Sequence, residues 1–226
     1  MPLCLGLAAN QLHHQGEAAA LFDFLRACEG GIRELGLGFH AVGRTYDAIA
    51  AAGMLQGHAG LWRYPYGRAG GLMKLVAEVV GMGSAETTLD GAIYLIDPVD
   101  PSSIFPEALA LKRQCVIHGK PFLSTVASAR DWVEMERIHA GLPRDPGADG
   151  LHDYKNQTLA LIAHDAMKPA MLDFAARNFA LLSRYQRRVG TGTTGQKLNE
   201  LAWSRGWPVG TPWVERYNSG PLGGDA

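Results

Sequence analysis

The sequence predicts an α/β fold: a doubly wound parallel sheet in three αβα layers, followed by a partial second copy of the same domain. Strand-like and helix-like segments alternate through residues 1–139, which is typical of a parallel sheet covered by helices. Short motifs from this part recur after residue 153 at nearly constant separation, which indicates an internal repeat. At 226 residues, the chain can bury one large core or two modest ones.

The elements expected in the first part follow from the spacing of apolar residues. A stripe of Ala18, Leu21, Phe22 and Leu25 predicts the first helix. Glycine-bearing or polar turns separate the later segments. We expect strands at 3–9, 35–42, 91–97 and 121–126, and helices that begin near residues 18, 43, 72, 106 and 128.

A composition change marks the boundary between the two parts. Residues 140–153 are rich in Gly, Pro and Asp and have no apolar period, so we expect a linker there. Beyond it, the run from Leu159 to Asp165 is typical of a buried parallel strand that delivers His164 and Asp165 at its carboxyl end. The predicted organisation is therefore a domain at 1–139, a linker at 140–153 and a second domain at 154–226.

Composition also excludes several classes of protein. A net charge of −1 gives no reason to expect a nucleic-acid or membrane partner, and no apolar run is long enough to span a bilayer. The three scattered cysteines form no CxxC pair, which fits a reducing cytoplasm. His13, His14 and Glu17 are more simply solvated loop residues than ligands of a metal. We expect a cytoplasmic protein without a metal.

The candidate site centres on a glycine and threonine turn, Val189-Gly-Thr-Gly-Thr-Thr-Gly-Gln-Lys197, before a helical pattern. Its glycines permit close backbone approach, its threonines supply donors, and a helix N-terminus favours an anion such as phosphate. The upstream strand would bring His164, Asp165 and then Lys168 to the same edge of the sheet. Downstream, Ser219-Gly-Pro-Leu-Gly-Gly-Asp225 ends on a carboxylate. A plain strand-to-helix turn with a threonine N-cap stays open as the alternative.

The motifs L-I-A-H-D-x-x-K, G-T-G-T-T-G and S-G-P-L-G-G-D together resemble the methylglyoxal synthase family over residues 158–225. The resemblance implies a lyase that converts a triose phosphate, dihydroxyacetone phosphate, to methylglyoxal and inorganic phosphate without a cofactor. It implies that Asp225 is the base, that His164 donates to the carbonyl oxygen, and that Asp165 orients the imidazole or assists proton transfer. It also implies a phosphate site formed by Lys168, Thr191, Gly192, Thr193, Thr194, Ser219 and Gly220.

The two copies of the repeat differ. In the first, Asn10 and Leu72 stand where the resemblance places the histidine and the base, so we interpret residues 1–139 as a catalytically silent relative. It could still bind an anion through Arg44 and Thr45. The second copy keeps the reactive residues but stops after Gly-Gly-Asp, which would leave the strand at 159–163 with an uncovered edge. We expect a longer parent chain or another segment to close it, and a homo-oligomer in which one chain covers another's strand.

Two further interpretations use the same residues. A phosphometabolite-binding regulatory module would bind the anion without turnover, and a pseudoenzyme would have lost activity altogether. At the level of single residues, His164 could be a core or capping histidine, Asp225 a turn residue, and Lys168 a solvated side chain.

Overall fold

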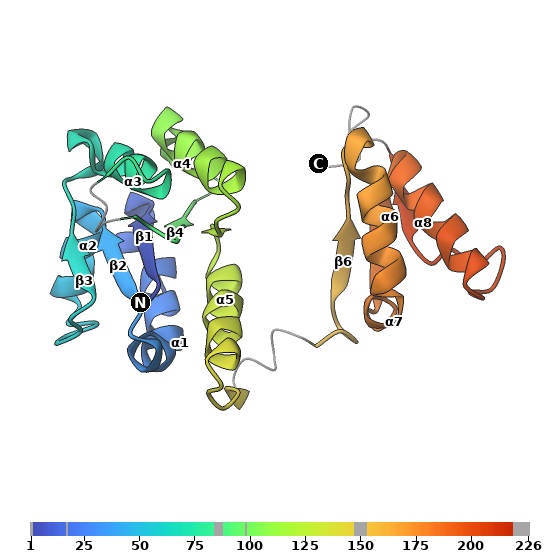
Figure 1. Ribbon diagram of the computed structural model, residues 1–226, viewed down its shortest axis with the longest axis horizontal. Coiled ribbons are helices and arrows are strands. Elements are labelled where there is room, and N and C mark those ends of the chain that lie inside the picture. Colours follow the sequence, from blue (N-terminus) through green and yellow to red (C-terminus); the bar gives the residue numbers. More distant parts are fainter. Residues whose placement is uncertain (1, 17, 84–87, 98, 147–152, 219–226) are drawn as a thin grey trace. The chain divides into compact units, whose positions relative to one another are not determined.

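Two compact units, residues 1–148 and residues 149–226, make up the computed structural model (Figure 1). The structure describes residues 2–16, 18–83, 88–97, 99–146 and 153–218. Each unit has its own parallel sheet and its own apolar core. No helix within these ranges is long and apolar enough to cross a bilayer.

A five-stranded parallel sheet forms the centre of the first unit. Its strand order is β3-β2-β1-β4-β5, with β1 in the middle. Every residue of β2 and β4 is buried, as expected for parallel strands that are covered on both faces. The strands are β1 (Cys4–Ala9), β2 (Gly38–Ala41), β3 (Leu61–Arg63), β4 (Gly91–Leu95) and β5 (Phe122–Leu123).

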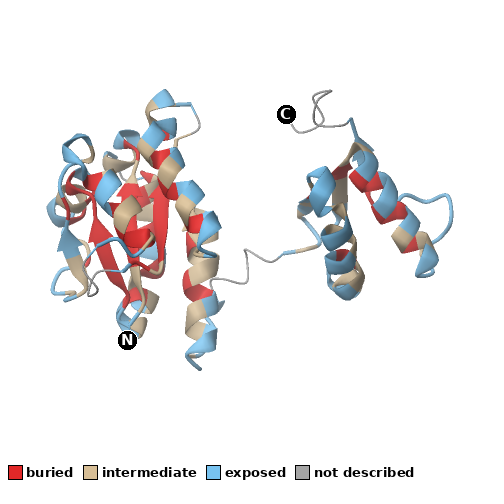
Figure 2. Cartoon of the chain, turned by 45° about the horizontal axis from the view of Figure 1, so that its top comes forward, coloured by how far each residue is buried: buried red, intermediate tan, exposed pale blue. Residues whose placement is uncertain are grey.

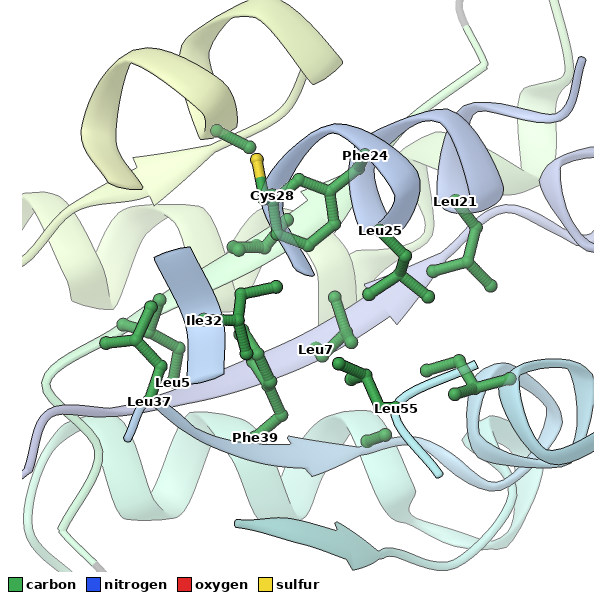
Figure 3. Packing of buried hydrophobic residues seen from close by; sticks show 14 of the residues in the cluster. Leu5, Leu7, Leu21, Phe24, Leu25, Cys28, Ile32, Leu37, Phe39 and Leu55 are labelled. Atoms are coloured by element: carbon green, nitrogen blue, oxygen red, sulfur yellow. The ribbon is translucent and has the colours of Figure 1, made fainter. Parts of the chain in front are cut away.

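Helices cover both faces of this sheet. Alternate residues of a strand point to opposite faces, so Leu5 and Leu7 pack with α1, α2 and α5 (Figure 3), whereas Ala8 packs with α3 and α4. The result is the three-layer α/β arrangement that the sequence predicts, with buried residues on the strands and on the helices that pack against them (Figure 2). The helices are α1 (Ala20–Leu35), α2 (Gly43–Ala51), α3 (Gly71–Val79), α4 (Pro106–Ile117) and α5 (Val126–His139), with short 3-10 turns η1 (Gln11–His14), η2 (Gly67–Ala69) and η3 (Pro101–Ile104).

The strand predicted at 35–42 begins too early. α1 continues through Leu35 and ends at Gly36, whose φ of 61° lies in the left-handed region that suits glycine. The N–H of Leu37 then donates to the carbonyl of Ile32 at 3.0 Å, which completes the helix cap. β2 therefore starts only at Gly38. β3 was not predicted, because three residues are too few to show a period.

The second unit contains three parallel strands in the order β6-β7-β8. Its core forms where Ala175 and Leu198 from the helices pack with Leu161 and Trp213. The elements are β6 (Thr158–Leu161), η5 (Asp165–Met167), α6 (Lys168–Arg177), α7 (Phe179–Leu182), β7 (Arg187–Thr191), α8 (Gly192–Ser204) and β8 (Glu215–Tyr217).

The buried strand predicted from Leu159 to Asp165 is wrong in length and in burial. β6 ends at Leu161, which is the one residue of this strand that is buried. Thr158 and Ala160 are exposed because, among the described residues, helices pack on one face of this sheet and β6 pairs on one side. Asp165 lies beyond the strand in η5, with His164 as its N-cap.

Asn199 ties α8 to the segment that enters β8, so its loss should destabilise the second unit selectively. Its amide donates to the carbonyl of Val214 at 3.0 Å and accepts from the N–H of Val214 at 2.7 Å, and all of these groups are buried. We predict that Asn199→Ala destabilises the second unit by ~2 kcal/mol, because buried backbone groups lose their partners. Hydrogen exchange should show faster exchange in residues 153–218 and unchanged exchange in residues 2–146. The control Gln196→Ala, on the exposed side of α8, should change neither, and equal protection in Asn199→Ala would contradict the assignment.

Candidate active site

The turn between β7 and α8 requires glycine because the chain passes very close to its neighbours. A Cβ on Gly190 would lie 2.9 Å from Cγ1 of Val214 and 3.1 Å from the carbonyl oxygen of Leu161. Gly192, at φ 37°, then opens α8. The close approach brings the end of β7 against the end of β6.

The N-terminus of α8 has the general features of a helix end that attracts anions. Thr191 occupies the N-cap position, but its side chain makes no capping hydrogen bond. The first amides of a helix have no partner within the helix, and the helix dipole is positive at this end. Over the 13 residues of α8, these effects favour a negatively charged group beside Gly192 and Thr193.

The segment after β6 supplies an imidazole and a carboxylate at the same edge of the sheet. His164 is the N-cap residue of η5, and its carbonyl accepts from the N–H of Met167 at 2.8 Å. Both His164 and Asp165 are exposed. Their side chains are therefore open to a ligand in solution.

Lys168 joins these two segments. Its ammonium group donates to the carboxylate of Asp165 and to the hydroxyl of Thr193. The Lys168 side chain is only 14% exposed although that of Asp165 is 86% exposed, so the cation is held against the turn. Thr194, which is buried, makes a weaker second link at 3.4 Å from its hydroxyl to the carbonyl of Ala163.

Positively charged groups surround one ionised carboxylate in the site, that of Asp165. The hydrogen bond from Lys168 lowers the pKa of Asp165, followed in effect by the charge of Lys168, and smaller contributions come from His164 and Lys197. Asp165 is therefore a carboxylate at neutral pH. Lys168, Lys197 and the N-terminus of α8 together leave a net positive environment for an anion.

The structure brings together most of the residues predicted for the site. Lys168, Asp165 and Thr193 are in direct contact, and His164 belongs to the same strand end. Asp165 bonds to Lys168, and no hydrogen bond joins it to His164 within the described part of the chain. Thr191, Gly192 and Thr194 lie at the start of α8. Ser219, Gly220 and Asp225 fall outside the described residues, so their roles stay predictions.

Lys197 was not singled out from the sequence. It lies four residues after Thr193 on α8, and residues at this spacing share a helix face. The four-residue spacing from Thr193 could therefore have identified Lys197 from the sequence. No group of three His, Cys, Asp or Glu side chains that could hold a metal occurs in the ranges that the structure describes.

In the first unit, the residues that follow β1 are engaged in protein contacts. The Asn10 amide donates to Asp100 at 3.0 Å, to Ser102 at 3.1 Å and to Ser103 at 2.8 Å. Thr45 is buried, and its hydroxyl already accepts from the N–H of Ala9 at 3.1 Å. Asn10 therefore stabilises a loop, and the Thr45 hydroxyl expected to bind an anion is already hydrogen-bonded.

Comparison with known proteins finds methylglyoxal synthases. The chain is 45% identical over 69 residues to a methylglyoxal synthase of Thermus thermophilus, a match that covers 30% of this chain and 48% of that protein. It is 40% identical over 67 residues to that of Clostridium botulinum strain Eklund 17B, covering 30% and 49%. The chain thus spans about half the length of the curated relatives it matches.

Among solved structures, the methylglyoxal synthase of Elizabethkingia anophelis NUHP1 aligns with a TM-score of 0.46 and 19% identity, over 64% of this chain and 88% of that one. No family model matches the chain. Homologues of methylglyoxal synthase therefore cover about 30% of the sequence.

The contact between Lys168 and Asp165 predicts a measurable change in acidity. We expect Lys168→Met to raise the pKa of Asp165 towards the ordinary range of an aspartate, because both the hydrogen bond and the largest nearby charge are removed. An NMR titration of the Asp165 carboxyl carbon measures this directly. The control Lys197→Met should give a smaller rise, since Lys197 acts through its charge alone. An unchanged pKa in Lys168→Met would show that the pair does not form in solution.

Proposed function

We propose that the second unit is a methylglyoxal synthase-like lyase that eliminates phosphate from dihydroxyacetone phosphate. The observation that carries the proposal is the position of Lys168, which contacts the Asp165 carboxylate and the Thr193 hydroxyl at the N-terminus of α8. A cation, a hydroxyl and free helix amides at one point are the groups that bind a phosphate. The relatives described above, at 40–45% identity over 67–69 residues, are methylglyoxal synthases, which supports this reaction.

In the proposed complex, each phosphate contact has a physical basis. An ammonium group has three donors, and Lys168 uses two of them within the protein, which leaves the third for a phosphate oxygen. Thr191 has an uncommitted capping hydroxyl, and Gly192 and Thr193 contribute N–H groups. Thr194 is buried, so it contributes its backbone amide rather than its hydroxyl. Ser219 and Gly220 complete the proposed phosphate site.

The chemical step needs a base and an electrophile. Asp225 would take the proton from the carbon next to the substrate carbonyl, while His164 donates a hydrogen bond to the carbonyl oxygen as negative charge develops there. The electrons of the broken C–H bond then form the enediolate, and the bond from carbon to the phosphate oxygen breaks. Inorganic phosphate leaves, and the enol product becomes methylglyoxal. Lys168 keeps Asp165 ionised. The Asp165 carboxylate would in turn hold the ammonium group of Lys168 in position and assist proton transfer.

We further propose that the chain is a tandem of a silent domain at 1–139 and a motif-bearing partial domain at 154–226. Strands β1, β2 and β3 are parallel neighbours in the same order as β6, β7 and β8, which supports the repeat. Asn10 and His164 are each the N-cap of a 3-10 turn that follows the first of these strands. In this interpretation, Asn10 stands in place of the histidine and has a structural role instead of a chemical one.

The expected partners are a small triose phosphate and further copies of the chain, with no nucleic acid, membrane or cofactor.

A phosphate-release assay tests the function. We predict that the full chain releases phosphate from dihydroxyacetone phosphate, that Asp225→Asn lowers the rate about 10²- to 10⁴-fold through loss of the base, and that His164→Gln lowers it about 10²- to 10³-fold. Matched controls are Asp173→Asn, which changes an exposed carboxylate on α6, and His139→Gln at the end of α5. Both should keep full activity.

Two outcomes would overturn the proposal. Phosphate binding without turnover by the unmodified chain would point to a regulatory module. Release that survives Asp225→Asn and His164→Gln would place the chemistry elsewhere.

A further inference from the structure

A chain of three buried polar side chains links α3 to two strands of the first unit. His40 lies on β2, Tyr64 directly follows β3, and Glu78 lies on α3. The Tyr64 hydroxyl donates to the Glu78 carboxylate and is also hydrogen-bonded to Nδ1 of His40. The same Nδ1 lies 3.6 Å from the Glu78 carboxylate. The reaction proposed for the second unit uses none of these groups.

The directions of these hydrogen bonds fix where the neutral imidazole carries its proton. A tyrosine hydroxyl has a single hydrogen, and that of Tyr64 points to Glu78. Nδ1 of His40 must therefore donate to the Tyr64 oxygen, so Nε2 carries no hydrogen. Within the described part of the chain, Nε2 has no hydrogen-bond partner. A second proton would have to be added at Nε2, inside the fold and without an acceptor.

The charged groups on α3 do not compensate for that second proton. Glu78 would attract it, but this carboxylate already accepts from Tyr64 and lies 3.9 Å from the ammonium group of Lys74. Burial lowers the pKa of His40, and the charge of Lys74 lowers it further, while Glu78 opposes both effects. His40 is therefore neutral in the folded unit at pH 7.

The neighbours of His40 on the other strands are uncharged. On β3, the Trp62 ring lies 5.0 Å from the imidazole, between ring centroids. On β1, burial raises the pKa of the Cys4 thiol to about 12, with smaller contributions from Asp90 and Glu78. The Asp90 carboxylate accepts from the backbone N–H of Cys4 at 2.7 Å. Neither strand therefore supplies a charge that would stabilise an imidazolium.

We propose that these three side chains act as a pH-sensitive switch: when His40 gains its second proton, α3 loosens from β2 and β3 while the rest of the first unit stays folded. α3 has nine residues and no side-chain N-cap, so it depends on its contacts with the sheet. Glu78 is the one charged residue on its buried face. α1, α2 and α5 pack on the opposite face of the sheet and share none of these groups.

The direction of the switch follows from where the proton is held more tightly. A histidine in an unfolded segment has a pKa of about 6.5, and that of His40 in the folded unit is lower. The released segment therefore binds more protons than the folded one. The attachment of α3 is complete above about pH 6.5 and weakens as the pH falls, by at most about tenfold per pH unit for one proton.

Hydrogen exchange of the full chain between pH 7 and pH 5 tests this inference, after correction for the pH dependence of exchange itself. We expect protection of residues 71–79 to fall by up to about tenfold per pH unit below pH 6.5, and protection of residues 20–35 to stay constant. His40→Asn keeps a donor near the position of Nδ1 but cannot titrate. In this variant, protection of residues 71–79 should be the same at both pH values.

A control and a second measurement separate this switch from a general loss of stability in acid. Burial lowers the pKa of His14 to about 4, but its ring is bonded to Thr45 on α2, so His14→Gln should leave the response of α3 unchanged. An NMR titration of His40 in the unmodified chain needs no variant and should give a midpoint below pH 6.5. Protection of α3 that does not change with pH, an acid response that persists in His40→Asn, or a midpoint at or above pH 6.5 would overturn the proposal.

Discussion

Parallel pairing of β6 with β7 is the constraint on which the rest of the second unit depends. Parallel strands end at the same edge of a sheet, so the segment after β6 and the turn after β7 must lie side by side. Because Gly190 has no side chain, the carbonyl oxygen of Leu161 can lie 3.1 Å from the position that a Cβ of residue 190 would occupy. Lys168 can therefore reach from the start of α6 to Thr193 while it still holds Asp165. Without this pairing, the imidazole, the cation and the helix N-terminus would have no common location.

The sequence predicted strands better where both faces of the sheet are covered than where only one face is covered. In the first unit, the apolar run at residues 91–95 is covered on both faces, and the strand predicted there is present. The strands predicted at 35–42 and 121–126 are shorter, because α1 ends only at Leu35 and α5 already begins at Val126. The same kind of run at 159–163 predicted a buried strand, but apolar composition does not report whether a neighbouring strand or helix is present. β3 and β8 escaped prediction because each has only three residues. The pairing of Lys168 with Asp165 rather than of His164 with Asp165 depends on side-chain direction, which spacing alone leaves undetermined.

Asn10 and His164 are both N-cap residues of a 3-10 turn that follows a strand, but their side chains differ in burial and in hydrogen bonding. Asn10 is buried, and its amide is hydrogen-bonded to three side chains of the loop at residues 100–103. Such a group stabilises the fold, but all of its donors are in use. His164 occupies the same place relative to its strand, yet it is exposed and has no hydrogen bond from its ring within the described residues. An imidazole in that state contributes little to folding and is accessible from solvent.

The end of β6 and the candidate site are physically linked, because His164 follows Leu161 by only three residues. Within the described residues, the segment between them is held by the burial of Leu161 and by the 3.4 Å hydrogen bond from Thr194 to the carbonyl of Ala163. These contacts hold the end of β6 from which η5 begins, so they limit the positions that His164 can take before any ligand is present.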